Sequence, residues 1–197
     1  MPKYPDVAEI DKVLKHTRIY GDMGIRDRAI LETLYSTGAR RMELANLMIH
    51  NLDIDDGKLQ ITEGKGIKDR VVPIGDRAVY WVSKYLKEVR PQLVIDQNND
   101  NGYLFLNNRG NPFHKNRLGD MVKKYLKAVG ITKPGACQLF RHCMATHMLD
   151  NGADTRHIQA ILGHADISTT QIYTHVSIEK LKEVHTATHP ANLYYDR

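Results

Sequence analysis

Residues 139–175 read LFRHCMATHMLDNGADTRHIQAILGHADISTTQIYTH. This stretch predicts three consecutive helices: one ending at Gly152, one running from an Asp154 cap to Gly163, and one starting at a Ser168 cap. Glycine is suited to ending a helix because it adopts the left-handed conformation without a steric penalty. The regular punctuation indicates a mainly helical domain.

The last of these predicted helices carries a tyrosine in an unusual setting. The neighbours of Tyr173 are mostly polar, namely Ser168, Thr169, Thr170, Gln171, Thr174 and His175. They offer little apolar surface for a phenol ring to cover. Packing alone therefore does not explain Tyr173.

The residues before this stretch predict further helices with a small sheet between them. Helical periodicity marks residues 6–17, 25–38, 78–90 and 117–130, and a short helix is expected from about Ala39 to Leu47. Residues 51–62 change to a period of two around the hairpin signal Asp56-Gly57. Residues 69–74 predict a third strand, with Pro73 at an edge or a strand end. The predicted fold is mainly α with a small three-stranded antiparallel β-sheet (α+β).

Several other residues are interpreted as packing or surface positions. We expect packing roles for Tyr35, Tyr80, Tyr85, Tyr125, Met144, Met148 and Leu149. Lys123, Lys124 and Lys127 face away from the apolar side of their predicted helix. A solvated face and contact with phosphates both fit these lysines.

Length and composition indicate one domain in a reducing compartment. The chain has 197 residues, with 28 Lys and Arg against 23 Asp and Glu, and a net charge of +5. This excess modestly favours a polyanionic partner. Cys137 and Cys143 fit neither a disulfide framework nor a Cys-x-x-Cys site. No apolar run approaches the roughly 20 residues that a membrane span needs, so we expect a soluble, cytoplasmic protein.

Four stretches of the chain occur together in one known family. They are STGARRMELANL at 36–47, EGKGIKDRVVPI at 63–74, the quoted residues 139–175, and VSIEKLKEVHTATHP at 176–190. In order and spacing they resemble the tyrosine site-specific recombinases, among them the Xer-like and phage-integrase-like members. The resemblance covers Pro5 to His189. It is specific because all four motifs occur in the order and at the spacing found in the family.

The resemblance implies an activity and a set of site residues. The activity is DNA strand cleavage and rejoining through a 3′-phosphotyrosyl intermediate, in site-specific recombination or DNA integration, with double-stranded DNA as partner and without a metal, ATP or other cofactor. The residues that match the family motifs are the phosphate-binding Arg40 and Arg141, the turn lysine Lys65, His164, the supporting acid Glu43 and the nucleophile Tyr173.

The chemistry needs these residue types. Phosphodiester transfer builds negative charge on nonbridging oxygens, which guanidiniums such as those of Arg40 and Arg141 meet with charge-assisted hydrogen bonds. A phenol with an ordinary pKa of about 10 is a poor nucleophile at neutral pH, so nearby cations must help Tyr173 to ionise. The departing 5′-oxygen needs a proton, and the amine of Lys65 is able to deliver it.

Each of these residues also has a plainer interpretation. Arg40 could interact with carbonyls at a helix C-terminus, and Glu43 could be an ordinary acid in the first turn of a helix. Four histidines could suggest a metal site, but their spacing along the chain matches no familiar ligand pattern: His142, His147, His157 and His164. We expect no metal site.

One position departs from the family pattern. Members usually carry a histidine three residues before the second arginine, where this chain has Gln138 before Arg141. Glutamine donates a hydrogen bond to phosphate but carries no proton or positive charge near pH 7. His142 points about 100° away on a helix and is a poor substitute. Phosphate binding is therefore expected to persist while proton handling weakens.

The resemblance also bears on domains and assembly. The family usually places an N-terminal DNA-clamping domain of about a hundred residues before the catalytic one. Here Met1 lies just upstream of the catalytic segment, so we expect residues 1–197 to form a single catalytic domain without that clamp, as either an excised fragment or a natural short form. Its core is expected at about 5–176 and its tail helix at about 177–189. Ile178, Leu181 and Val184 form a narrow stripe on this tail. The family docks such a helix onto a neighbouring subunit, which implies a homo- or hetero-tetramer on paired DNA sites.

Two other functions remain open at the level of sequence. Type IB topoisomerase-like DNA relaxation uses a similar Arg-Lys-Arg-His-Tyr set, but such an enzyme acts alone and has no need of a docking tail. A noncatalytic DNA-binding module is conceivable because of Gln138. Formation of a covalent adduct with DNA separates this module from both enzymes.

Overall fold

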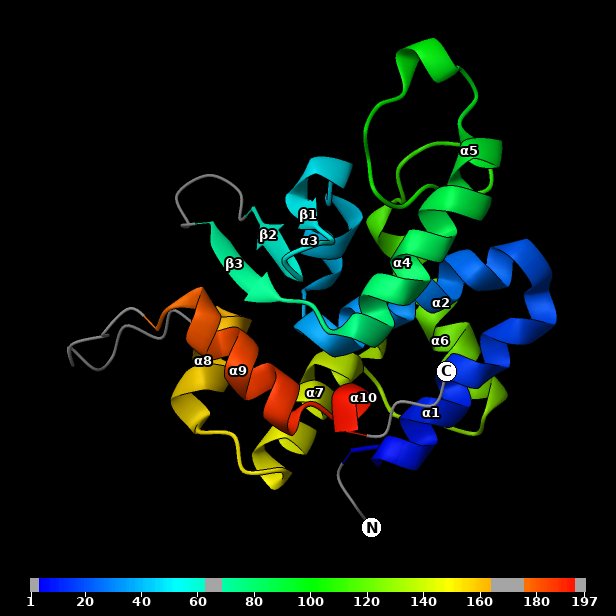
Figure 1. The fold of residues 1–197 in the computed structure, drawn as a ribbon. Helices are drawn as coiled ribbons and strands as arrows, with labels where there is room; N and C mark the ends of the chain where they lie inside the picture. Colours follow the sequence, from blue (N-terminus) through cyan, green and yellow to red (C-terminus); the bar gives the residue numbers. More distant parts are fainter. Residues whose placement is uncertain (1–3, 63–68, 164–175, 194–197) are drawn as a thin grey trace.

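The computed structural model describes residues 4–62, 69–163 and 176–193. It is mainly helical, with one three-stranded antiparallel sheet of order β1-β2-β3, which confirms the predicted fold class (Figure 1). The elements in chain order are α1 (Val7–His16), η1 (Thr17–Tyr20), α2 (Gly21–Thr37), α3 (Arg41–Ala45), η2 (Ile49–Asn51), β1 (Leu52–Asp53), β2 (Lys58–Ile61), β3 (Arg70–Pro73), α4 (Asp76–Glu88), α5 (Arg90–Leu93), η3 (Gln97–Asn99), α6 (Lys115–Ala128), α7 (Ala136–Asp150), α8 (Thr155–Leu162), α9 (Ile178–Thr188) and α10 (Pro190–Leu193).

The sheet forms where the sequence predicts it. Gly57 has a positive φ of 61° in the turn between β1 and β2, where a side chain would be strained. β2 pairs with β3 so that Ile61 lies opposite Arg70, and β3 ends at Pro73 as expected. The short sheet therefore leads from α3 to α4 and presents the start of β3 near α8 (Figure 1).

Helix α2 forms the centre of the molecule and packs against α4 and α7 (Figure 1). Its residues from Arg26 to Thr37 are all buried, including charged ones. The Glu32 carboxylate accepts hydrogen bonds from Nε of Arg28 at 2.7 Å and Nε of Arg77 at 2.9 Å. Buried charges are tolerated when they are paired in this way. The pair with Arg77 consequently ties the middle of α2 to α4.

Two helices begin at least one turn earlier than the sequence pattern predicts. The helix expected from Ile25 begins at Gly21, and the helix that ends before Gly152 begins at Ala136, ahead of the stretch quoted from Leu139. In the second case Cys137, Leu139 and Phe140 are buried and extend the core-facing side of α7 toward its N-terminus. Helices α8 and α9 begin at the predicted caps: Asp154 accepts from the Arg156 amide and Ser177 from the Lys180 amide. The helix predicted from Ser168 lies outside the described residues.

Most of the predicted packing residues are buried. The core includes Tyr35, Tyr85, Tyr125, Met144 and Met148. The expectation for Tyr80 and Leu149 is wrong, because these side chains are 52% and 41% exposed. Tyr80 lies on the outer side of α4, where its ring meets Trp81 edge-on, and Leu149 lies in the last turn of α7.

The surface includes the three lysines of α6. Lys123, Lys124 and Lys127 are exposed, and Nζ of Lys124 lies 3.9 Å from the ring centroid of Tyr20. Both interpretations of this lysine cluster therefore remain compatible with its position. Across residues 4–62, 69–163 and 176–193, every helix is too short or too polar to cross a bilayer.

Candidate active site

Gly38 places Arg40 at the start of a new helix. It ends α2 with a left-handed φ of 62°, and its amide donates to the Leu34 carbonyl at 3.0 Å. A Cβ on Gly38 would collide with the side chains of Met144 and Leu162. The chain therefore turns sharply at a crowded point, and Arg40 becomes the N-cap residue of α3.

The buried Glu43 holds the start of α3 through hydrogen bonds with Arg40. Its carboxylate accepts hydrogen bonds from the Arg40 amide at 2.7 Å and from Nη1 of Arg40 at 2.8 Å. Both terminal nitrogens of Arg70 also donate to it, each at 2.9 Å. Burial raises the pKa of Glu43, but the hydrogen bonds and charges of Arg70 and Arg40 outweigh this effect and lower the pKa to about 2. Glu43 is thus a first-turn acid of α3 that two guanidiniums share.

Arg141 reaches the same region from α7. Its Nη1 donates to the Gly38 carbonyl at 2.6 Å and its Nη2 to the Leu162 carbonyl at 2.7 Å. The residue is only 6% exposed, whereas the side chain of Arg40 is 42% exposed. Arg141 therefore ties the end of α2 to the end of α8, and Arg40 presents its guanidinium toward solvent.

Three arginines surround the C-terminal end of α8. The carbonyls of Ile161, Leu162 and Gly163 accept from Arg70 at 3.0 Å, Arg141 at 2.7 Å and Arg40 at 3.5 Å, respectively. The last carbonyls of a helix have no partner inside the helix and carry partial negative charge. Among the described residues of this cluster, three arginines, Arg40, Arg70 and Arg141, face one carboxylate, that of Glu43, and this excess of positive charge suits an anionic ligand.

Gln138 lies on α7, three residues before Arg141. It is exposed and lines a shallow depression together with His142, which stacks on the ring of Tyr4 at a centroid distance of 5.3 Å. Arg141, three residues further on, directs its guanidinium to Gly38 and Leu162 instead. The plainer interpretation of Arg40 also has support, since one of its nitrogens does contact a helix-terminal carbonyl.

Three predicted site residues lie outside the described residues: Lys65 within 63–68, and His164 and Tyr173 within 164–175. Their placement is therefore untested. The described residues next to both segments do come together, because Arg70 follows the first segment and its Nε donates to Ile161, shortly before the second. The structure thus brings together Arg40, Glu43 and Arg141 among the predicted residues.

Arg70 belongs to this cluster, and the sequence interpretation missed it. The alternation of inward and outward side chains along β3 could have revealed it. Alternate residues of a strand share a face, and Arg70 shares its face with Val72, which is fully buried. An arginine on the inward face of a strand needs partners, and here it finds Glu43 and the end of α8.

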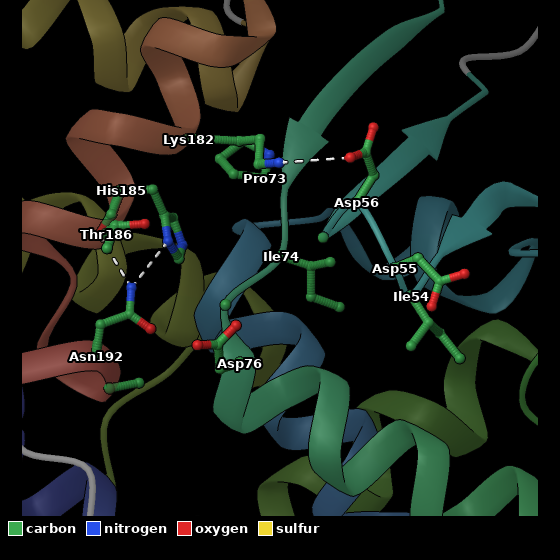
Figure 2. A pocket seen from close by; sticks show the side chains of 13 residues that line it. Ile54, Asp55, Asp56, Pro73, Ile74, Asp76, Lys182, His185, Thr186 and Asn192 are labelled. Atoms are coloured by element: carbon green, nitrogen blue, oxygen red, sulfur yellow. Dashed lines mark hydrogen bonds and ion pairs between the residues drawn. The ribbon is translucent and has the colours of Figure 1, made fainter.

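A cavity lies at the other end of β3. Its volume is about 360 Å³, and it is lined by the β1–β2 turn, the residues after β3, and parts of α9 and α10 (Figure 2). On one wall Nδ2 of Asn192 contacts Nδ1 of His185 at 3.3 Å (Figure 2). None of the arginines of the cluster lines this cavity. Within the part of the chain that the structure describes, His, Cys, Asp and Glu side chains form no group of three that could hold a metal ion.

Comparison with known proteins places these features in a family. Tyrosine recombinase XerC 2 from Ralstonia nicotianae is 47% identical over 98% of this chain, which spans 57% of that protein's length. The crystal structure of XerA recombinase superposes with a TM-score of 0.74 at 34% identity, covering 100% of this chain and 66% of that one. XerH bound to difH substrate, in a pre-cleavage complex, gives a TM-score of 0.70 at 25% identity, with 91% and 52% covered. The family model described as "Phage integrase family" matches residues 4–180. The chain therefore belongs to the phage integrase family.

Proposed function

We propose that this chain is the catalytic part of an enzyme that cleaves and rejoins double-stranded DNA in site-specific recombination. The observation that carries the proposal is the arginine cluster, in which buried Arg141 and half-exposed Arg40 meet at the end of α8. Similarity to a tyrosine recombinase and to a recombinase bound to its DNA substrate supports it. The catalytic core is proposed at 5–176 and the tail at 177–189.

The proposed reaction is a transesterification at phosphorus. The phenol oxygen of Tyr173 attacks the scissile phosphate and loses its proton, a P–O bond to tyrosine forms, and the bond to the 5′-oxygen breaks. The 5′-oxygen leaves as a hydroxyl after accepting a proton. The 3′-phosphotyrosyl ester retains the bond energy, so attack by another 5′-hydroxyl rejoins the strand and releases the phenol. The reaction needs no ATP and no external oxidant or reductant.

Each proposed residue has one task in this reaction. The guanidiniums of Arg40 and Arg141 bind the nonbridging oxygens and stabilise the charge that develops on them. Lys65 supplies the proton to the leaving oxygen. His164 and Gln138 donate hydrogen bonds to the phosphate, and Glu43 orients Arg40. We propose that no metal ion takes part.

The tail requires a more specific proposal than the sequence alone suggested. Within this single chain α9 packs against β3, α7 and α8, and it buries Leu181, His185 and Thr188. Helix α9 therefore covers part of the described core. We propose that on paired DNA sites α9 leaves this position and occupies the same position on a neighbouring copy, which links the subunits of a tetramer. The contacts that α9 makes with its own chain support this proposal.

The test uses metal-free conditions. Duplexes bound by the native protein are selected from a random-sequence pool, nicked near the site so that cleavage is trapped, and incubated with the protein in EDTA. The proposal predicts a covalent protein–DNA adduct and, with intact paired sites, recombinant products. DNA binding without an adduct would mean a noncatalytic module. An adduct accompanied by relaxation of supercoiled DNA and no recombinants would point to topoisomerase-like action. We further propose the cytoplasm, where the DNA substrate lies, as its location.

A further inference from the structure

Arg70 makes more contacts at the candidate site than its place in a short strand requires. Its two terminal nitrogens grip both oxygens of Glu43 at 2.9 Å, and its Nε donates to the Ile161 carbonyl at 3.0 Å. The side chain is 11% exposed. A planar guanidinium holds a carboxylate in one orientation through such a two-point contact. Arg70 therefore connects β3 with α3 and with the end of α8.

The turn at the end of α8 is shaped around this side chain. Gly163 ends the helix with a left-handed φ of 68°. A Cβ at Gly163 would lie 2.8 Å from Cδ and 2.9 Å from Nε of Arg70. Any larger residue would push the guanidinium away from Ile161. The glycine thus both ends α8 and leaves the space that Arg70 occupies.

The charge balance explains what this contact does for Arg40. Glu43 accepts two hydrogen bonds from Arg40 and two from Arg70. With Arg70 present, two cations share one carboxylate, and the group keeps a net positive charge. Without Arg70, Glu43 and Arg40 would neutralise each other, and the carboxylate would be free to rotate toward Arg40. The half-exposed guanidinium of Arg40 would then be weaker as a partner for phosphate.

We propose that Arg70 is a positioning residue for DNA cleavage: by clamping Glu43 and the end of α8 it holds the guanidinium of Arg40 in place and offsets the negative charge of Glu43, so that Arg40 is available to bind the scissile phosphate. This role rests on the proposed function. Arg70 does not touch the reacting atoms in this account. It acts through Glu43, which connects it to Arg40.

The test compares three variants of the native protein in single-turnover cleavage of the nicked duplex. Arg70→Met removes the charge, Arg70→Lys keeps it but loses the two-point contact, and Lys84→Met breaks an exposed Lys84–Glu88 ion pair on α4 as a matched control. A misplaced reacting group costs on the order of 10²-fold in rate, so Arg70→Met is expected to cleave about 10²-fold more slowly. Arg70→Lys should fall between Arg70→Met and the wild type, and Lys84→Met should match the wild type.

A pH profile separates positioning from a purely structural role. In the wild type Glu43 stays ionised far into the acid range, because Arg70 and Arg40 lower its pKa to about 2. Loss of Arg70 leaves the burial that raises this pKa, so the acid limb of the cleavage rate should move to higher pH in both Arg70 variants. A structural role alone would reduce the rate in step with the unfolded fraction, measured by circular dichroism, and would leave the acid limb unmoved.

Each outcome decides the proposal. Slower cleavage by folded Arg70→Met with a shifted acid limb supports it. A wild-type rate, or a loss fully accounted for by unfolding, overturns the role of Arg70 while the proposed function stands. If Arg70→Met does not fold, the same shift in Arg70→Lys decides the matter. A wild-type protein that forms no adduct overturns both the proposed function and this role.

Discussion

Gln138 is the residue at which this chain departs from its family's pattern. It is exposed on α7 beside His142, and glutamine has no proton to exchange near neutral pH. We expect Gln138→His to accelerate single-turnover cleavage, by roughly 10²-fold at the lower end of the range for acid–base groups. An unchanged or slower rate would show that the site works with glutamine as it stands. His142→Gln is the control, and its cleavage rate should not change.

Gly38 is the residue on which the geometry of Arg40 depends. Its positive φ and the nearness of Met144 and Leu162 both exclude a side chain. Gly130 offers a matched control, since it has a φ of 86° but a Cβ added there would meet nothing within 4 Å. A left-handed conformation costs an alanine roughly 1–2 kcal/mol. Gly130→Ala should lose about this amount in urea unfolding, and Gly38→Ala clearly more. Equal losses would mean that Met144 and Leu162 give way without cost.

The sequence was sufficient to predict some residues of the arginine cluster but not all of them. Arg40, Glu43 and Arg141 were predictable because short motifs carry them, and the structure brings them together. The pairing of Arg70 with Glu43 joins a strand to a helix 27 positions away in sequence. Short-range patterns carry no information about such a contact. Only the inward position of Arg70 on its strand hinted at a partner.

Among the elements, α9 and α10 differ most from their sequence interpretation. The predicted stripe was Ile178, Leu181 and Val184, but only Leu181 of these is fully buried. The buried face instead continues through His185 and on to His189. Nε2 of His185 lies 2.7 Å from the Ser36 carbonyl, and Nε2 of His189 lies 2.9 Å from the Tyr35 carbonyl. Histidines that bond to backbone carbonyls are polar in a hydrophobicity count, so periodicity did not reveal this face.

These histidines predict a pH-dependent stability. Burial is the main cause that lowers the pKa of His185 to about 4, and burial together with the charge of His185 lowers the pKa of His189 well below its ordinary value. The unfolded chain, with histidine pKa values of about 6.5, then binds more protons than the folded one. The free energy of unfolding should therefore be highest above pH 6.5. Between pH 6.5 and 4.5 each of the two histidines should lower it by about 1.4 kcal/mol for every pH unit of acidification.

Urea unfolding at several pH values measures this effect. His185→Gln keeps a side-chain donor for the Ser36 carbonyl but does not titrate, so its stability should depend less steeply on pH than that of the wild type. His142→Gln, at an exposed position, should keep the wild-type slope. A His185→Gln slope equal to that of the wild type would contradict the assignment of His185 as a buried neutral group.

The whole molecule brings four elements to one place. The end of α2, the start of α3, the start of β3 and the end of α8 converge on Glu43 and its arginines. Helix α9 packs against β3, and its His185 contacts the Ser36 carbonyl of α2 (Figure 1). The helical class and the small sheet were predictable because caps, turn residues and periodicity are local. Their convergence was not, since it depends on packing around the buried helix α2.

The proposed exchange of α9 between subunits gives a prediction for the assembly. A protein that ends before Ser177 should still bind a single DNA site but fail to form higher-order complexes on paired sites, as measured by light scattering and native gels. Thr186→Ala, which changes an exposed position on α9, should assemble normally. Near-UV circular dichroism must show that the shortened protein keeps its packing. Full-length rates of complex formation and recombination in the shortened protein would show that α9 only packs on its own domain.

The central claim is that Tyr173 forms the covalent bond to DNA. The most direct measurement is mass spectrometry of the protein–DNA adduct after nuclease and protease digestion, which identifies the residue that carries the phosphate. The account predicts a nucleotide on the peptide containing Tyr173, no adduct with Tyr173→Phe, and a normal adduct with the control Tyr80→Phe, whose ring is exposed on α4. A phosphate on another residue, or an adduct that persists in Tyr173→Phe, would contradict it.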